Sequence, residues 1–301
     1  MGIISRRSLI AASVALPAVA QDTTFRVDVK LVRMLATVKN AQGQLVGGLN
    51  KEEFTITDNG VPQEVALFER NTSQPLSIAM LVDTSRSTER EKRYELESVR
   101  KFMKALVHEG NPDDALGLYS FNYQVTMEVN FTRRFDKLAA ALGRLKSEGA
   151  TALYDAIYLA GDDLEHREGR RVAVVVSDGG DTFSKVRFDK ALEALHRANA
   201  VLYAVLVVPV AGDAGRNMRG ENALYTLTNW TGGKVFTPTH GPALDDAFQQ
   251  ILRELRTQYL LGFYPRNIEP SKDRFHKVRL DVNRPAHSVS ARNGYFADAI
   301  R

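Results

Sequence analysis

Two short, almost continuous apolar runs constrain the fold of this chain more than any other feature. They are "LSIAMLVD" at residues 76–83 and "RRVAVVVSD" at residues 170–178, and such runs are typical of strands that are buried on both faces. Helical periodicity follows the first run over residues 88–109. One stripe of that segment collects Leu96, Val99, Phe102, Met103 and Leu106. Apolar strands that alternate with helices predict an α/β fold with a doubly wound, mostly parallel sheet flanked by helices.

The segments on either side of this unit read as strands rather than helices. Asp58-Asn59-Gly60 lies between two extended runs and predicts a hairpin. Extended runs return after Thr257. We therefore predict a β-rich N-terminal flank at 21–75, an α/β domain at 76–257 and a β-rich C-terminal flank at 258–301. Inside the α/β domain we expect one helix over 135–149, ending at Gly149, and a final helix over 241–258.

The first twenty residues have the three parts of an export signal. Arg6 and Arg7 give a basic start, an apolar stretch follows, and Ala18-Val19-Ala20 offers a cleavage site. We predict a signal peptide at 1–20 and an exported protein, periplasmic or extracellular. "SRRSLI" resembles a twin-arginine signal but lacks its usual phenylalanine and lysine, so Sec export stays open. A membrane anchor is disfavoured because the apolar run is too short to span a bilayer.

Composition excludes several kinds of site. The chain has 301 residues and no cysteine, which excludes disulfides, thiolate metal sites and cysteine nucleophiles. Its net charge is +4, but acidic and basic residues are interleaved, which favours solvated helix faces over a nucleic-acid surface. No later segment is apolar enough to cross a membrane. The histidines show no metal-ligand spacing, and we interpret all of them as surface residues: His108, His166, His196, His240, His276 and His287.

Three predicted loops carry oxygen-bearing side chains. The first, after residues 76–83, contains Asp83, Ser85 and Ser87; the second contains Thr151 and the third Asp178. In an open α/β sheet, ligands bind outside the carboxyl ends of the strands, where these loops are expected to meet. Hydroxyl and carboxylate oxygens are hard ligands that suit Mg²⁺, Mn²⁺ or Ca²⁺.

The order "DTSRS", "GAT" and "SDG" resembles the von Willebrand factor type A domain and its metal-ion-dependent adhesion site. The resemblance covers about residues 76–257. It implies that Asp83, Ser85, Ser87, Thr151 and Asp178 hold Mg²⁺, or Mn²⁺ or Ca²⁺. It also implies an open coordination position that an aspartate or glutamate of a partner protein fills. The flanks look like those of the von Willebrand-A-related proteins of acidobacteria, which implies one small β-sandwich built from both flanks.

Each loop also has a purely structural explanation. Ser87 or Thr88 could cap the following helix, with Glu91 completing a capping box for Thr88. Thr151 could cap its own helix, and Asp178 could serve only the turn before the next glycine. Asp181 is a second carboxylate in the third loop, but the family position is the first one, so we expect no direct ligand there.

The sequence favours a binding protein over an enzyme. "DTSRST" lacks the second aspartate of the D-x-D phosphatase pattern, and the chain has neither a G-x-S-x-G elbow nor a P-loop. A metal-dependent hydrolase or phosphotransferase and an envelope scaffold with a structural metal remain the alternatives. In some von Willebrand A domains the C-terminal helix shifts as the site changes affinity. Here that helix leads directly into the C-terminal flank, which suggests coupling between metal site and β-domain.

Overall fold

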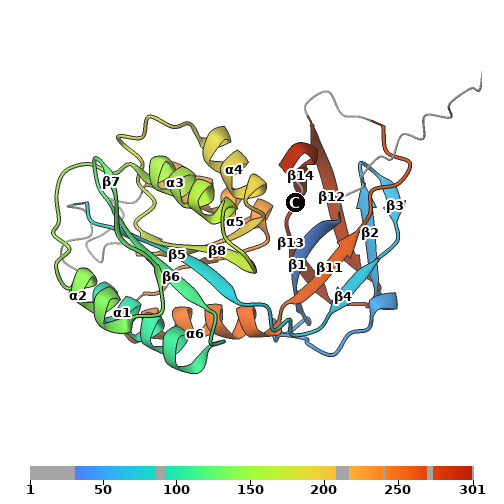
Figure 1. Ribbon diagram of the computed structural model, residues 1–301, viewed down its shortest axis with the longest axis horizontal. Helices are drawn as coiled ribbons and strands as arrows, with labels where there is room; N and C mark the ends of the chain where they lie inside the picture. The colour runs from blue at the N-terminus through green and yellow to red at the C-terminus, as the bar shows by residue number, and fades with distance from the viewer. Residues whose placement is uncertain (1–30, 86–91, 208–216, 240, 270–273, 300–301) are drawn as a thin grey trace, which may run out of the picture.

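The protein has an α/β part and a part made of two small sheets, which lie side by side in the computed structural model (Figure 1). The structure describes residues 31–85, 92–207, 217–239, 241–269 and 274–299. None of the helices in these ranges combines the length and the apolar character needed to cross a membrane.

A mixed, mostly parallel sheet forms the centre of the α/β part. In the described ranges its strand order is β10-β9-β8-β5-β6-β7, and only the edge strand β7 runs antiparallel to its neighbour. The strands are β5 (Leu76–Asp83), β6 (Ala115–Phe121), β7 (Val125–Thr132), β8 (Arg170–Ser177), β9 (Ala200–Leu206) and β10 (Val235–Phe236). Every residue of β5 is buried, as the apolar run predicted, because both faces of this central strand are covered by helices.

Helices cover both faces of the sheet, and the predicted fold class is confirmed. The helices are α1 (Lys92–Glu109), α2 (Phe135–Leu142), α3 (Leu153–Glu165), α4 (Phe188–Arg197), α5 (Met218–Thr231) and α6 (Gly241–Thr257). One core cluster joins the sheet to α1, α2 and α6. A second joins it to α3, α4 and α5 on the other face (Figure 1).

Strands from both flanks build a β-sandwich beside the α/β part. One antiparallel sheet has the order β13-β1-β11-β4 and the other has β14-β12-β2-β3. The first sheet contains β1 (Val32–Lys39), β4 (Leu67–Glu69), β11 (Tyr259–Phe263) and β13 (Ser288–Ala291). The second contains β2 (Phe54–Asp58), β3 (Val61–Gln63), β12 (Phe275–Val282) and β14 (Gly294–Phe296). Short 3₁₀ turns lie at η1 (Lys51–Glu53) and η4 (Ala297–Ala299). The two sheets share a core in which Met34, Ile56, Leu261 and Tyr295 are buried.

The expected hairpin at Asp58-Asn59-Gly60 is present. It joins β2 to β3, and Asn59 and Gly60 both have positive φ, at 48° and 84°. This is the backbone that a two-residue turn of the I′ type requires.

The structure differs from the sequence prediction in three respects. First, α2 ends at Leu142, with Gly143 as its C-cap, and does not continue to Gly149. Second, α5 and β10 were not anticipated. Third, the histidines are not all on the surface: His196 is 4% exposed and His276 8%, while His240 lies outside the described residues.

Candidate metal centre

Asp83 is the last residue of β5 and is completely buried. The parallel register pairs Val82 with Val176, so Asp83 lies level with Ser177 at the end of β8. The Ser177 hydroxyl donates to Asp83 Oδ2 at 2.6 Å, and the Ser85 N–H donates to Oδ1 at 2.8 Å. Both carboxylate oxygens are therefore fixed by residues at the carboxyl edge of the sheet.

The electrostatic surroundings of Asp83 favour a nearby cation. Burial is the main cause that raises the pKa of Asp83 to about 6, and the charge of Asp178 also raises it. Hydrogen bonds from Ser177 and Ser85 act in the opposite direction and lower this pKa. Asp83 and Asp178 thus lie within electrostatic reach of each other. A buried carboxylate near a second one is costly to ionise unless a positive charge compensates. Two carboxylates with surrounding hydroxyls fit a hard divalent ion in this respect.

Hydrogen bonds tie the three predicted loops together. The Thr84 carbonyl accepts from the Glu148 N–H at 2.8 Å, which joins the first loop to the second. The Thr151 N–H donates to the Thr182 hydroxyl at 3.0 Å, and the Thr182 N–H returns a bond to the Thr151 carbonyl at 2.8 Å. These contacts join the second loop to the third, and the bond from Ser177 to Asp83 closes the ring.

Thr151 does not serve as the cap of α3. The N-cap position is Ala152, and no side chain at that position caps the helix. Instead Asp181 Oδ1 accepts from the Leu153 N–H at 2.9 Å, and the Ser184 hydroxyl accepts from the Tyr154 N–H at 3.0 Å. The Thr151 hydroxyl is therefore not committed to the helix end.

Asp181 has a structural role that the sequence reasoning missed. Besides capping α3, it accepts a hydrogen bond from the Ser184 hydroxyl at 2.6 Å. Its backbone partner Leu153 lies 28 residues earlier in the chain, and no local pattern reveals a cap supplied from that distance. Ser177 also had no role predicted from the sequence, although its hydroxyl fixes the Asp83 carboxylate.

Asp178 is half-buried and takes part in the turn that was the alternative explanation for it. Its Oδ1 accepts from the Gly180 N–H at 2.8 Å. The first turn of α5 packs against this loop so closely that a Cβ at Gly220 would lie 1.7 Å from the Gly179 carbonyl oxygen. The unanticipated helix α5 therefore helps to position the loop that carries Asp178.

Four of the five predicted ligands fall within the described residues, and all four lie in the interlinked loops at this edge of the sheet. Asp83, Ser85 and Thr151 are 0%, 2% and 5% exposed, and Asp178 is more accessible. Ser87, Thr88 and Glu91 lie outside the described residues, as does the predicted cap at the start of the 88–109 helix. Within the described ranges, no cluster of three or more His, Cys, Asp or Glu side chains has the arrangement of a metal site.

Comparison with known proteins identifies the domain. The family model of the von Willebrand factor type A domain matches residues 78–180. The described fold is similar to the von Willebrand factor domain of the type V pili tip protein Mfa5 from Porphyromonas gingivalis, with 11% identity over 61% of this chain and 97% of that one, at TM-score 0.50. It is also similar to a von Willebrand factor type A protein from Catenulispora acidiphila, with 10% identity over 89% of this chain and 75% of that one, at TM-score 0.51.

This chain therefore contains a von Willebrand factor type A domain, as its three loop motifs predicted. Its match to the PilB minor pilin from Streptococcus sanguinis has 12% identity and TM-score 0.48 and covers 62% of each chain. The chain thus spans less than two thirds of that pilin. No curated protein sequence matches it.

Proposed function

We propose that this protein is an exported, divalent-cation-dependent binding module that captures an acidic group of a partner protein. The observation that carries the proposal is the buried carboxylate of Asp83, held among hydroxyl-bearing loops at the carboxyl edge of the sheet. In this proposal the metal ligands are Asp83, Ser85, Ser87, Thr151 and Asp178, and the ion is Mg²⁺, or Mn²⁺ or Ca²⁺.

The bound ion would supply a Lewis-acidic position for a carboxylate. Asp83 and Asp178 provide about two negative charges, so the ion keeps an affinity for a third carboxylate. Ser177 and the Ser85 N–H keep the Asp83 carboxylate in one orientation. Asp178 is only half-buried, and in this proposal a partner's aspartate or glutamate reaches the ion from its side. Adhesion through such a contact agrees with the occurrence of the same fold in a pili tip protein.

Export is part of the proposal and rests on the sequence. Arg6, Arg7 and Ala18-Val19-Ala20 have the pattern of a cleaved signal peptide, and residues 1–20 lie outside the described residues. A β-sandwich assembled from both ends of the chain would remain attached to the α/β part after the signal is removed.

Metal binding by purified mature protein tests the proposal directly. Isothermal titration with Mn²⁺ and Mg²⁺ should show saturable binding by the wild type. Asp83→Asn and Asp178→Asn should each weaken binding about tenfold or more, because each removes a charged oxygen ligand. Asp189→Asn is the matched control, since Asp189 is exposed on α4 and is paired with Arg187. Absence of divalent-ion binding by the wild type would refute the adhesion-type site.

A second experiment separates binding from scaffolding and catalysis. Immobilised wild-type protein should retain envelope proteins in Mg²⁺ and release them in EDTA, whereas Asp83→Asn should retain none of them. Loss of metal together with a large drop in melting temperature, but without any captured partner, would favour the envelope scaffold. Asp83-dependent turnover of phosphate esters would instead identify a hydrolase or phosphotransferase.

A further inference from the structure

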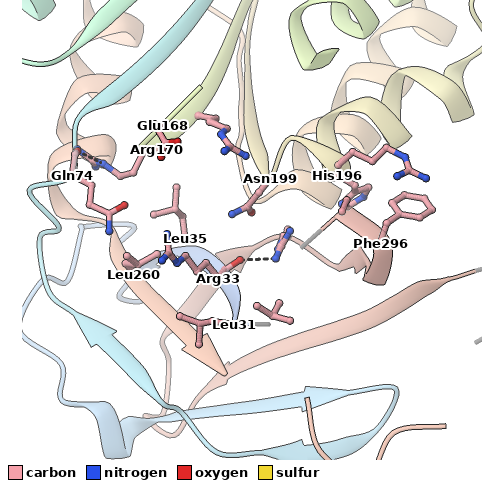
Figure 2. A pocket seen from close by; sticks show the side chains of 16 residues that line it. Leu31, Arg33, Leu35, Gln74, Glu168, Arg170, His196, Asn199, Leu260 and Phe296 are labelled. Carbon is pink, nitrogen blue, oxygen red and sulfur yellow. Dashed lines mark hydrogen bonds between the residues drawn. The ribbon is translucent and has the colours of Figure 1, made fainter. Parts of the chain in front are cut away.

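A polar cavity of about 340 Å³ lies between the β-sandwich and the base of the central sheet (Figure 2). Its walls come from β1, the start of β8, the end of α4, β11 and β14. Arg170 begins β8 and Ser177 ends it. The cavity and the candidate metal centre therefore lie at opposite edges of the sheet and are separate sites.

The walls of the cavity carry an excess of positive charge. Glu168 is the one acidic residue among the described residues that line it. Five arginines line the same cavity, namely Arg33, Arg170, Arg171, Arg197 and Arg292. Both domains contribute to this set, since Arg33 and Arg292 belong to the sandwich.

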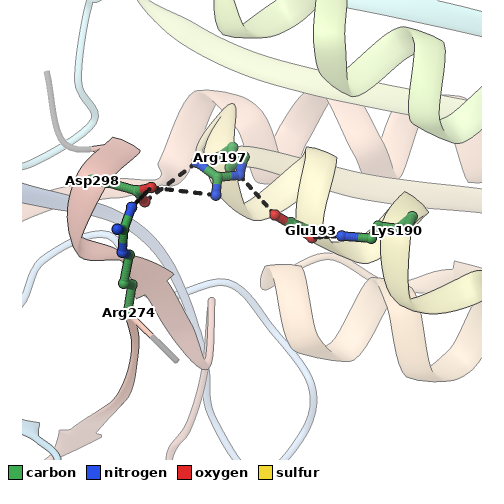
Figure 3. Close-up of polar contacts among 5 residues, drawn as sticks. All are labelled: Lys190, Glu193, Arg197, Arg274 and Asp298. Carbon is green, nitrogen blue, oxygen red and sulfur yellow. Dashed lines mark hydrogen bonds and ion pairs between the residues drawn. The ribbon is translucent and has the colours of Figure 1, made fainter. Parts of the chain in front are cut away.

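Arg197 has two acidic partners. It pairs with Glu193 at 2.9 Å and with Asp298 at 3.3 Å, and these acids also bind Lys190 and Arg274 (Figure 3). Arg170 donates from Nε to the Gln74 carbonyl at 2.9 Å and from Nη1 to the Leu255 carbonyl, and the charge of Asp114 acts on its guanidinium.

Arg292 is buried, and its guanidinium lies over the Tyr295 ring, 5.8 Å from the ring centroid. It is 9% exposed, and its Nη2 donates to the Arg33 carbonyl at 2.5 Å, while its Nε has no hydrogen-bond partner in the described part of the chain. Burial lowers the pKa of Arg292 to about 10, so the side chain stays charged at neutral pH. Neither Arg292 nor the exposed Arg33 forms an ion pair with a described carboxylate. An isolated buried charge of this kind is costly unless an anion compensates it.

His196 lies close to Arg292 in the wall of this cavity. It lines the same cavity and is 4% exposed, with its ring against Phe275 and the Gly294 backbone. Burial, with the nearby charge of Arg292, lowers the pKa of His196 to about 4, which keeps the ring neutral at pH 7. A neutral imidazole retains one N–H donor, and its ring nitrogens and Arg292 Nε are fully buried in the wall of the cavity.

We propose that this cavity binds a small oxyanion, phosphate or carboxylate, through Arg292 and Arg33 of the sandwich and Arg170 at the base of the central sheet. Guanidinium groups present paired N–H donors that match both kinds of oxyanion. The bound anion neutralises Arg292 and connects the two parts of the molecule. This site is independent of divalent metal at the opposite edge of the sheet.

Calorimetric titration and thermal unfolding of the full protein test the site. The ligands are sodium phosphate and sodium succinate, and each is compared with sodium chloride at matched ionic strength. Phosphate or succinate should bind saturably and raise the melting temperature of the wild type beyond the effect of chloride. Arg292→Gln and Arg33→Gln should each weaken that binding about tenfold. Because Arg33 is exposed, its variant is expected to fold normally, and Arg292→Lys keeps the buried charge.

Arg279→Gln is the matched control, because it removes one arginine from β12 of the same sandwich, where Arg279 pairs with Asp281. It should bind the anion as the wild type does. A response to phosphate alone assigns a phosphate-type ligand, and a response to succinate alone assigns a carboxylate. Wild-type responses that do not exceed chloride, or equal responses in Arg33→Gln, Arg292→Gln and Arg279→Gln, would overturn the proposal.

Discussion

At the scale of single residues, the buried His196 makes the stability of this protein depend on pH. Its ring contacts Phe275 of the sandwich with centroids 5.3 Å apart, and burial lowers its pKa from 6.5 to about 4. As the pH falls, the unfolded chain binds the proton first, below about 6.5, and the folded protein does so only near 4. The stability gained by burying the neutral ring is therefore fully present above pH 6.5 and is lost toward pH 4. The resulting loss of unfolding free energy is at most about 3 kcal/mol.

Urea unfolding at pH 7 and pH 4.5 measures this contribution. The loss of unfolding free energy between the two pH values should be smaller in His196→Leu than in the wild type, by about 1–3 kcal/mol. His166→Leu removes an exposed histidine and should keep the wild-type difference. Equal losses in the wild type and both variants would contradict the role of His196.

Sequence reasoning at this scale succeeded where a residue's position follows from the end of a strand. Asp83 and Asp178 were placed at one sheet edge because each directly follows an apolar run. It failed for His196 and for Asp181, whose environments are set by residues far away in the chain. A capping carboxylate 28 residues from its helix and a histidine covered by another domain have no local sequence pattern.

At the scale of elements, α5 controls the position of the loop that carries Asp178. A Cβ at Gly220 would lie 1.7 Å from the Gly179 carbonyl oxygen, so Gly220→Ala must push the helix and the loop apart. We expect Gly220→Ala to weaken divalent-ion binding about tenfold and to lower stability by about 1–3 kcal/mol. Mn²⁺ titration and urea unfolding would measure the two effects.

Gly48→Ala is the control for this experiment, because a Cβ at Gly48 meets no atom within 4 Å. It should leave both metal affinity and stability near those of the wild type. Wild-type metal affinity in Gly220→Ala would mean that α5 does not position the Asp178 loop.

The same helix shows why some elements escape sequence analysis. The segment Met218–Thr231 is largely polar and its apolar stripe is weak, so periodicity did not reveal it. Its ends do carry signals, since the Asn217 side chain accepts from the Gly220 N–H at 2.9 Å and Gly232 is the C-cap. Conversely, α2 ends at Leu142 with Gly143 as its C-cap, so the apolar residues that follow do not continue the helix.

At the scale of the whole molecule, α6 connects the α/β part to the sandwich with one residue, Gln258, between it and β11. Gln258 is 1% exposed, and near the end of α6 Glu254 pairs with Lys39 of β1 at 2.5 Å. A short, buried connection of this kind allows little independent movement of α6 and the sandwich. A shift of α6 would therefore be passed to β1 and β11 as a movement of the sandwich rather than absorbed by a loop.

This connection predicts that ligand binding at the metal centre changes the orientation of the sandwich. The small-angle scattering curve of the wild type in EDTA should differ from its curve in Mn²⁺ with a saturating acidic peptide. Asp83→Asn should give the same scattering curve under both conditions. Glu254→Gln loosens the contact to Lys39 and should reduce the difference, while Glu97→Gln, which removes an exposed pair with Arg100 on α1, should not. Superimposable wild-type curves at proven saturation would show that the sandwich is held independently of the metal centre.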